Sequence, residues 1–188
     1  MIIWITGLSG AGKTTLCNAL RDTLRPVLPE LVILDGDDVR TAFGQDLGYH
    51  KADRLKQLHR LQSMATVLAK QGLVVIVGVL YAHPDVLEWN RENMPDYFEI
   101  YLDASLETVK ARDAKGIYAM AERGDMSDVV GIDIEWHVPK NPNLTFDADY
   151  PLPPLQLAEQ VIAEIPRLKS ALSSRDLGSA KPRSGAVG

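Results

Sequence analysis

Short apolar segments alternate with longer stretches of helical pattern along the whole chain. The apolar segments predict strands at residues 2–5, 31–34, 73–77, 97–102 and 144–146. Helices are expected at residues 15–20, 53–71, 84–94 and 154–168, and a further one after Ser105, while residues 115–142 show no clear period. Strands that alternate with helices favour an α/β fold, in which a parallel β-sheet is sandwiched between helices. Ligands of such sheets bind beyond the carboxyl ends of the strands.

Length and composition place these elements in one domain. A chain of 188 residues can bury a substantial single core. We expect the domain to span residues 1–169, because apolar residues become scarce from Ser170 onward. Residues 170–188 are therefore predicted to form a disordered C-terminal tail.

The charge balance narrows the classes of partner. The net charge of −5 argues against a broad basic surface for nucleic acid, although a local basic pocket for a small anion is compatible with it. Cys17 is the only cysteine, so no internal disulfide can form. The longest apolar run, residues 73–81, is too short for a membrane span, and the first residues lack the pattern of a signal peptide. These features predict a cytoplasmic protein without a membrane or nucleic-acid partner and leave the oligomeric state open, a homodimer included.

The most informative motif follows the first strand directly. Residues 7–14 read Gly-Leu-Ser-Gly-Ala-Gly-Lys-Thr, which fits the phosphate-binding pattern G-x-x-x-x-G-K-[ST] between a strand and a helix. Glycines let backbone N–H groups approach phosphate oxygens, and the N-terminus of the following helix favours an anion. Lys13 would reach the β- and γ-phosphates of a nucleotide, and the Thr14 hydroxyl would contact Mg²⁺. A flexible glycine turn is the alternative; the flanking strand and helix favour nucleotide binding.

Two aspartates follow the second predicted strand. Asp35 and Asp37 flank a glycine, one strand away from the phosphate-binding loop. Two carboxylates in that place suit two roles, which are to hold Mg²⁺ and to accept a proton from an attacking hydroxyl. An acidic turn without a function is the alternative, because such residues are common in turns. Their position beside the loop favours a functional role.

Basic residues extend the candidate site. Arg54 heads the apolar stripe of the long predicted helix, so its side chain either reaches water or points into a cleft toward an anion. The role of Arg60 on the same helix stays open. Arg112 and Lys115 lie where a mobile lid could fold over a bound nucleotide and exclude water, with an ordinary surface loop as the alternative.

Over residues 1–148 the chain resembles the adenylyl-sulfate kinases, which phosphorylate the 3′-hydroxyl of adenosine 5′-phosphosulfate with ATP. The resemblance rests on the loop at 7–15, on Leu-Asp-Gly-Asp-Asp-Val-Arg at 34–40, on Ala-Arg-Asp-Ala-Lys-Gly-Ile-Tyr at 111–118, and on shorter matches at 46–49, 53–54 and 131–133. It implies a P-loop kinase fold with a mobile lid, ATP as co-substrate with Mg²⁺, and a small nucleotide as acceptor.

The same resemblance implies a role for each matching residue. The catalytic residues would be Lys13, Asp35 and Asp37, with Asp37 as the base toward the acceptor hydroxyl and with Thr14 and Asp35 as the Mg²⁺ ligands. The ATP site would comprise Gly7, Leu8, Ser9, Gly10, Ala11, Gly12, Lys13, Thr14, Thr15 and, against the adenine, Arg112. The acceptor site would comprise Arg40, Tyr49, Arg54, Gln57 and the lid residue Lys115.

Departures from the family pattern fall on the acceptor side. Leu80-Tyr81-Ala82 stands where the family has Ile-Ser-Pro, whose serine has been described as a phosphorylated intermediate. Gln57-Leu58-His59-Arg60 replaces Asn-Ile-Arg-Arg, and Val129-Val130 replaces a Phe-Thr whose ring stacks on the acceptor adenine. Such stacking is worth about 1–3 kcal/mol. Two acceptors remain: adenosine 5′-phosphosulfate, favoured as the family substrate, and another nucleotide-linked compound such as cytidine diphosphoramidate, used by a relative in capsule modification.

Two other functional classes fit the sequence less well. A regulatory GTPase would need an Asn-Lys-x-Asp string to read guanine, and the sequence has none. A catalytically silent nucleotide-binding module would have no need of Lys13, Thr14, Asp35 and Asp37 together, and all four are present.

Overall fold

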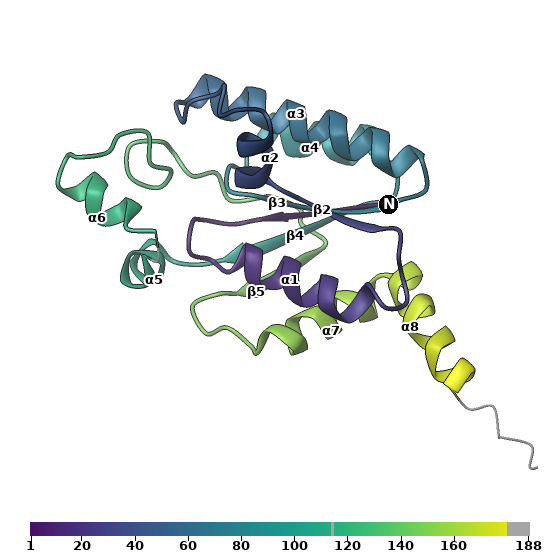
Figure 1. Ribbon diagram of the computed structural model, residues 1–188. Helices are drawn as coiled ribbons and strands as arrows, with labels where there is room; N and C mark the ends of the chain where they lie inside the picture. Colours follow the sequence, from purple (N-terminus) through teal and green to yellow (C-terminus); the bar gives the residue numbers. More distant parts are fainter. Residues whose placement is uncertain (114, 180–188) are drawn as a thin grey trace, which may run out of the picture.

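A twisted parallel sheet with helices on both faces forms the centre of the molecule (Figure 1). The computed structural model describes residues 1–113 and 115–179. Its strands are β1 (Ile2–Thr6), β2 (Leu31–Asp35), β3 (Val74–Val79), β4 (Tyr97–Asp103) and β5 (Leu144–Asp147). They lie in the order β2-β3-β1-β4-β5, and each neighbouring pair is parallel. The predicted α/β fold and all of the predicted strands are confirmed.

The burial of the strands follows from their places in the sheet. Every residue of β1 and β3 is buried, because both strands have neighbours on either side and helices on both faces. Their continuous apolar sequences are typical of such fully covered strands. The edge strand β2 is only partly buried. The sheet therefore has its most apolar strands at its centre, next to the start of the phosphate-binding loop.

The helices form two layers and one extension. α1 (Lys13–Leu24), α7 (Pro154–Glu164) and α8 (Pro166–Ser179) cover one face, and α2 (Gly36–Ala42), α3 (Lys51–Lys70) and α4 (Pro84–Asn93) cover the other (Figure 1). α5 (Leu106–Arg112) and α6 (Ile117–Glu122) extend beyond the carboxyl ends of the strands. No helix among the described residues is long and apolar enough to cross a membrane.

Three details differ from the sequence-based expectations. The short helices α2 and α6 were not expected. The helix predicted at 154–168 is interrupted at Ile165, whose backbone is extended because proline follows it. α8 then continues to Ser179, past the predicted start of the tail at Ser170, while residues 180–188 lie outside the described part of the chain. That residues 170–188 form a disordered tail stays a prediction. Ala171 and Leu172 pack against the core, which gives this helix an apolar anchor that the sparse pattern did not reveal.

The strand order determines where a ligand can bind. The chain leaves β1 toward the β2 edge, and it later reaches β4 on the opposite side of β1. In open parallel sheets a crevice forms at such a point, outside the carboxyl ends of the strands. The segments that follow β1, β2, β3 and β4 all begin at this edge, so four separate parts of the sequence can contribute to one site.

Candidate functional site

A cavity of about 500 Å³ opens at the carboxyl ends of the central strands. Its walls come from the phosphate-binding loop, the start of α2, the first turns of α3, the segment after β3, the residues Asp113, Lys115, Ile117 and Tyr118, and the stretch 126–130. The cavity brings together most of the predicted site residues, namely Ser9, Gly10, Gly12, Lys13, Thr14, Thr15, Asp35, Asp37, Arg40, Tyr49, Arg54, Gln57 and Lys115. The lining does not include four other predicted residues of the ATP site, which are Gly7, Leu8, Ala11 and Arg112.

The glycine loop has the backbone shape that an anion-binding turn requires. Gly10 and Gly12 adopt positive φ angles of 83° and 99°, which side chains other than glycine rarely allow. Gly7 packs so tightly that an added Cβ would lie 2.8 Å from the carbonyl oxygen of Leu102. Gly12 is also the N-cap of α1, so the unpaired N–H groups of the first turn of that helix face the loop.

Lys13 folds back over this loop. Its Nζ donates to the carbonyl oxygens of Gly7 and Leu8, both at 2.8 Å. Burial lowers the pKa of Lys13 to about 8, and the positive charge of Lys115 acts in the same direction. The ammonium is thus held at the mouth of the loop in surroundings that solvate its charge poorly, where a phosphate would stabilise it.

Asp35 and Asp37 lie beside the loop at the end of β2. The Asp35 carboxylate caps α2 by accepting from the Asp37 backbone N–H at 2.8 Å, and its other oxygen accepts from the Thr14 hydroxyl at 3.4 Å. Asp37 points into the cavity instead and pairs with Lys115, with 2.5 Å between Nζ and the carboxylate oxygen. Thr14 and Asp35 supply two neighbouring oxygen ligands of the kind that Mg²⁺ takes together with phosphate oxygens and water.

Two buried arginines flank an aromatic ring on the opposite wall. Arg40 and Arg54 are only 7% and 9% exposed. Their guanidinium carbons lie 4.8 Å and 5.5 Å from the centre of the Tyr49 ring. The Arg54 Nη2 donates to the Asp128 carbonyl at 2.7 Å. Of the two interpretations of Arg54, the structure supports the one in which it points into the cleft. Burial lowers the pKa of Arg54, and the charge of Arg40 adds to that effect.

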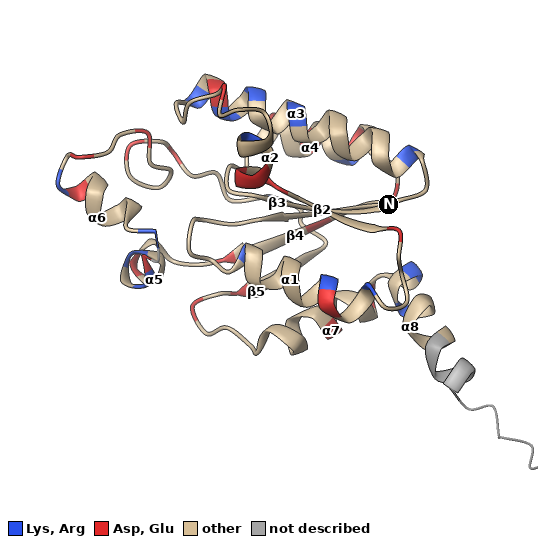
Figure 2. Ribbon diagram, viewed as in Figure 1, with Lys and Arg blue, Asp and Glu red and all other residues tan. Residues whose placement is uncertain are grey.

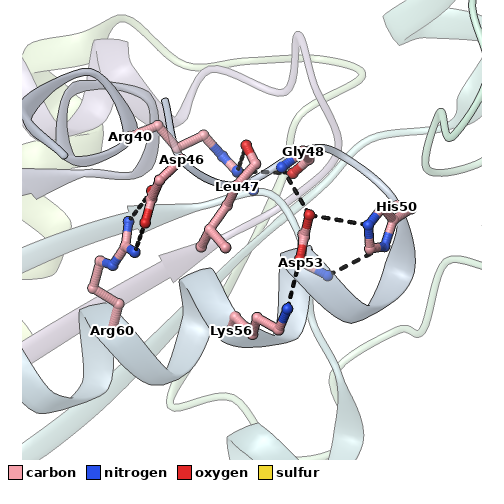
Figure 3. A network of polar contacts seen from close by, with 8 residues as sticks. All are labelled: Arg40, Asp46, Leu47, Gly48, His50, Asp53, Lys56 and Arg60. Atoms are coloured by element: carbon pink, nitrogen blue, oxygen red, sulfur yellow. Dashed lines mark hydrogen bonds and ion pairs between the residues drawn. The ribbon is translucent and has the colours of Figure 1, made fainter. Parts of the chain in front are cut away.

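The segment that carries Tyr49 is held in place by polar contacts on both sides (Figure 3). Arg40 donates to the Gly48 carbonyl at 2.9 Å, and Asp53 accepts from the Gly48 N–H at 2.8 Å. Arg60 pairs with Asp46 through two nitrogens, at 2.6 and 3.0 Å. This pairing gives Arg60, whose role was open, a part in fixing the loop outside the cavity lining.

Gln57 also has an internal partner. Its Nε2 donates to the Gly36 carbonyl at 3.0 Å, and only 4% of the residue is exposed. The contact joins α3 to the turn between the two aspartates. Gln57 therefore lines the cavity, as a residue of the predicted acceptor site would, and in addition fixes the distance between the helix and Asp37.

The predicted lid residues connect the glycine loop to distant segments. Arg112 donates to the Ala148 carbonyl at 2.7 Å and approaches the Gly10 carbonyl at 3.5 Å. The Tyr118 hydroxyl donates to the Ser9 carbonyl at 3.1 Å, and the residue is 2% exposed. Tyr118 belongs to the matching string at 111–118, but nothing in its sequence pattern pointed to contact with the phosphate-binding loop. The mobility of the lid stays a prediction.

Basic side chains line this cavity although the chain is acidic overall. Lys13, Arg40, Arg54 and Lys115 all line it, in a chain of net charge −5. Figure 2 shows charged residues at the carboxyl end of the sheet, in α2 and on the connection between α5 and α6. Asp35, Asp37, Asp113 and Asp128 line the cavity as well, so its lining carries as many acidic as basic residues. The four basic side chains nevertheless offer local positive charge to a small polyanionic ligand.

Comparisons with known proteins identify the family of this chain. The family profile described as adenylylsulphate kinase matches residues 1–147. The adenylyl-sulfate kinase of Picosynechococcus sp. is 37% identical over 147 residues, which is 78% of this chain and 83% of the relative. That of Rippkaea orientalis is 35% identical over 163 residues, 87% of each chain. The structure of the Mycobacterium tuberculosis APS kinase in complex with AMPPNP and APS has a TM-score of 0.78 at 33% identity and covers 87% of this chain and 95% of that one. This chain therefore belongs to the adenylylsulphate kinase family.

Proposed function

We propose that this chain transfers the γ-phosphoryl group of ATP to the 3′-hydroxyl of adenosine 5′-phosphosulfate. The observation that carries the proposal is that one cavity joins a phosphate-binding loop to an aspartate and to two buried arginines. The relatives named adenylyl-sulfate kinase support this acceptor, and none of the comparisons favours cytidine diphosphoramidate. The reaction uses ATP, which is a cytoplasmic substrate, so the proposal includes a cytoplasmic location.

The loop side of the cavity would hold the donor nucleotide. The N–H groups of the loop and of the first turn of α1 would bind the phosphates, and Lys13 would neutralise charge on the γ-phosphate. Thr14 and Asp35 would hold Mg²⁺. The ion would supply positive charge that stabilises the phosphates during transfer. Arg112 is proposed to lie against the adenine, beyond the loop.

The opposite wall would hold the acceptor. Arg40, Arg54 and the ring of Tyr49 offer positive charge and an aromatic face, which suit the anionic group and the base of a nucleotide. Asp37 lies between the two halves and would accept the proton of the 3′-hydroxyl. Lys115 would hold the Asp37 carboxylate in place through their ion pair.

Catalysis would then consist mainly of positioning and charge neutralisation. Phosphoryl transfer needs an acceptor oxygen in line with the leaving oxygen, and little covalent chemistry from the protein. Two residues of the predicted lid already contact the site, Tyr118 at the loop and Lys115 at Asp37. Closure of this lid would exclude water and prevent hydrolysis of ATP in place of transfer.

The test offers the two acceptors separately to the purified protein with MgATP and follows ATP turnover in a coupled assay. The proposal predicts the larger kcat/KM for adenosine 5′-phosphosulfate, and the loss of turnover by orders of magnitude in Lys13→Ala. A larger kcat/KM for cytidine diphosphoramidate would move the assignment to that acceptor. Turnover at background with both would indicate a silent nucleotide-binding module.

A further inference from the structure

Tyr81 has a buried hydroxyl for which the protein itself supplies no partner. The residue follows β3, lines the cavity and is 3% exposed. Among the described residues, no group lies within hydrogen-bonding distance of its hydroxyl. The Nε of Arg54, in the same cavity wall, is likewise buried and without a partner. Buried polar groups in proteins are nearly always hydrogen-bonded, so two such exceptions in one cavity need an explanation.

Both residues line one cavity but come from different elements. Arg54 stands in the first turns of α3 and Tyr81 in the segment after β3, and the positive charge of Arg54 acts on the phenol of Tyr81. Burial nevertheless raises the pKa of Tyr81, so its hydroxyl keeps its proton at neutral pH. The Tyr81 ring is held by an edge contact with the His83 ring, with 5.9 Å between their centres.

The chemistry of the pair selects its ligand. An arginine Nε–H can only donate, and the tyrosine hydroxyl in the same cavity can donate as well. The Arg54 guanidinium cannot turn away, because its Nη2 is bonded to the Asp128 carbonyl. A group that satisfies both donors must therefore be an acceptor, and an anionic oxygen forms the strongest bonds with them.

We propose that Tyr81 is a specificity-determining residue that donates, together with the Nε–H of Arg54, to the anionic phosphosulfate group of the acceptor. The inference rests on the proposed function, since it assigns a ligand group to the acceptor half of the same cavity. It gives Tyr81 a role in acceptor binding and none in ATP binding, because the phosphate-binding loop forms the other side of the cavity.

Tyr81→Phe separates this role from a structural one, because the variant removes only the oxygen atom. The KM for adenosine 5′-phosphosulfate should rise about tenfold or more, since hydrogen bonds to charged groups are strong, while the KM for ATP stays the same. The Tm should stay the same or rise, because no protein hydrogen bond is lost. Calorimetric binding of adenosine, which lacks the anionic group, should be equal in both proteins.

Tyr97→Phe is the matched control. The Tyr97 hydroxyl donates to the buried Glu99 at 2.9 Å, near the opposite end of the sheet. Its removal should lower the Tm and leave the acceptor KM unchanged. The inference is overturned if Tyr81→Phe keeps the wild-type acceptor KM, or if its Tm falls as in the control.

If the proposed function is wrong, the kinetic assay gives a different result from the one that overturns the inference about Tyr81. In that case the wild-type protein itself would not turn over adenosine 5′-phosphosulfate. Calorimetry with this compound then decides the inference by itself: weaker binding to Tyr81→Phe than to wild type supports it, and equal binding or none to either protein overturns it.

Discussion

Raising the pH from 7 to 9 should weaken ATP binding about tenfold through a single lysine. The pKa of Lys13 is lowered to about 8 in the ligand-free protein, chiefly by burial. About nine-tenths of the molecules carry the charged ammonium at pH 7 and only about a tenth at pH 9, which follows from that pKa. If the charged form is the one that binds phosphate, the apparent affinity falls by the same ratio.

For the same reason, ATP binding should be accompanied by the uptake of protons. The phosphates would raise the pKa of Lys13 back toward its ordinary value, because an opposite charge favours the ammonium. At pH 8 the protein should therefore take up about half a proton for each ATP bound. Titration calorimetry at pH 8 in two buffers of different ionisation enthalpy measures this number directly.

A second variant tests the cause of the lowered pKa. Lys115 is the next largest cause after burial, so Lys115→Met should raise the pKa of Lys13 and move the loss of affinity to higher pH. An ATP affinity that is constant between pH 7 and 9 in the wild-type protein, or binding at pH 8 without proton uptake, would refute the reasoning about Lys13.

Three further variants test separate parts of the structure. Asp37→Asn should lower kcat at least about a hundredfold and spare the ATP Kd, because it removes a general base; an unchanged kcat would exclude that role. Arg91→Met should cost about 3 kcal/mol in urea unfolding, because it removes the 2.7 Å partner of the fully buried Glu99; a loss within error would show that the pair is not stabilising. Gly7→Ala should weaken ATP binding at least about tenfold, since its Cβ would lie 2.8 Å from the Leu102 carbonyl oxygen and displace the loop; calorimetry showing wild-type affinity would contradict this packing.

The parts of the fold that the sequence predicts are those with a strong local signal. Local sequence alone is enough to recognise the apolar runs of β1 and β3 and the glycine pattern at 7–14. α2 spans only Gly36–Ala42 and has no apolar period, so its start depends on the cap that Asp35 provides. The sequence pattern therefore does not predict α2, and only the structure shows it.

The contacts that organise the site depend on residues far apart in the chain. Asp37 and Lys115 are 78 positions apart, and Arg54 and Asp128 are 74 apart. The sequence allowed the Arg54 side chain either to reach water or to enter the cleft, and its bond to the Asp128 carbonyl supports the cleft. No local pattern could show that Tyr81 and Arg54 would leave polar atoms unpaired in one cavity.

The central claim is that this protein phosphorylates the 3′-hydroxyl of adenosine 5′-phosphosulfate, and label transfer tests it most directly. The purified protein is incubated with γ-labelled ATP, Mg²⁺ and adenosine 5′-phosphosulfate, and the labelled product is identified by chromatography and NMR, with Lys13→Ala as the control. The account predicts label on the 3′-oxygen with the wild-type protein and background with the variant. Label found only in inorganic phosphate, or equal transfer by both proteins, would contradict it.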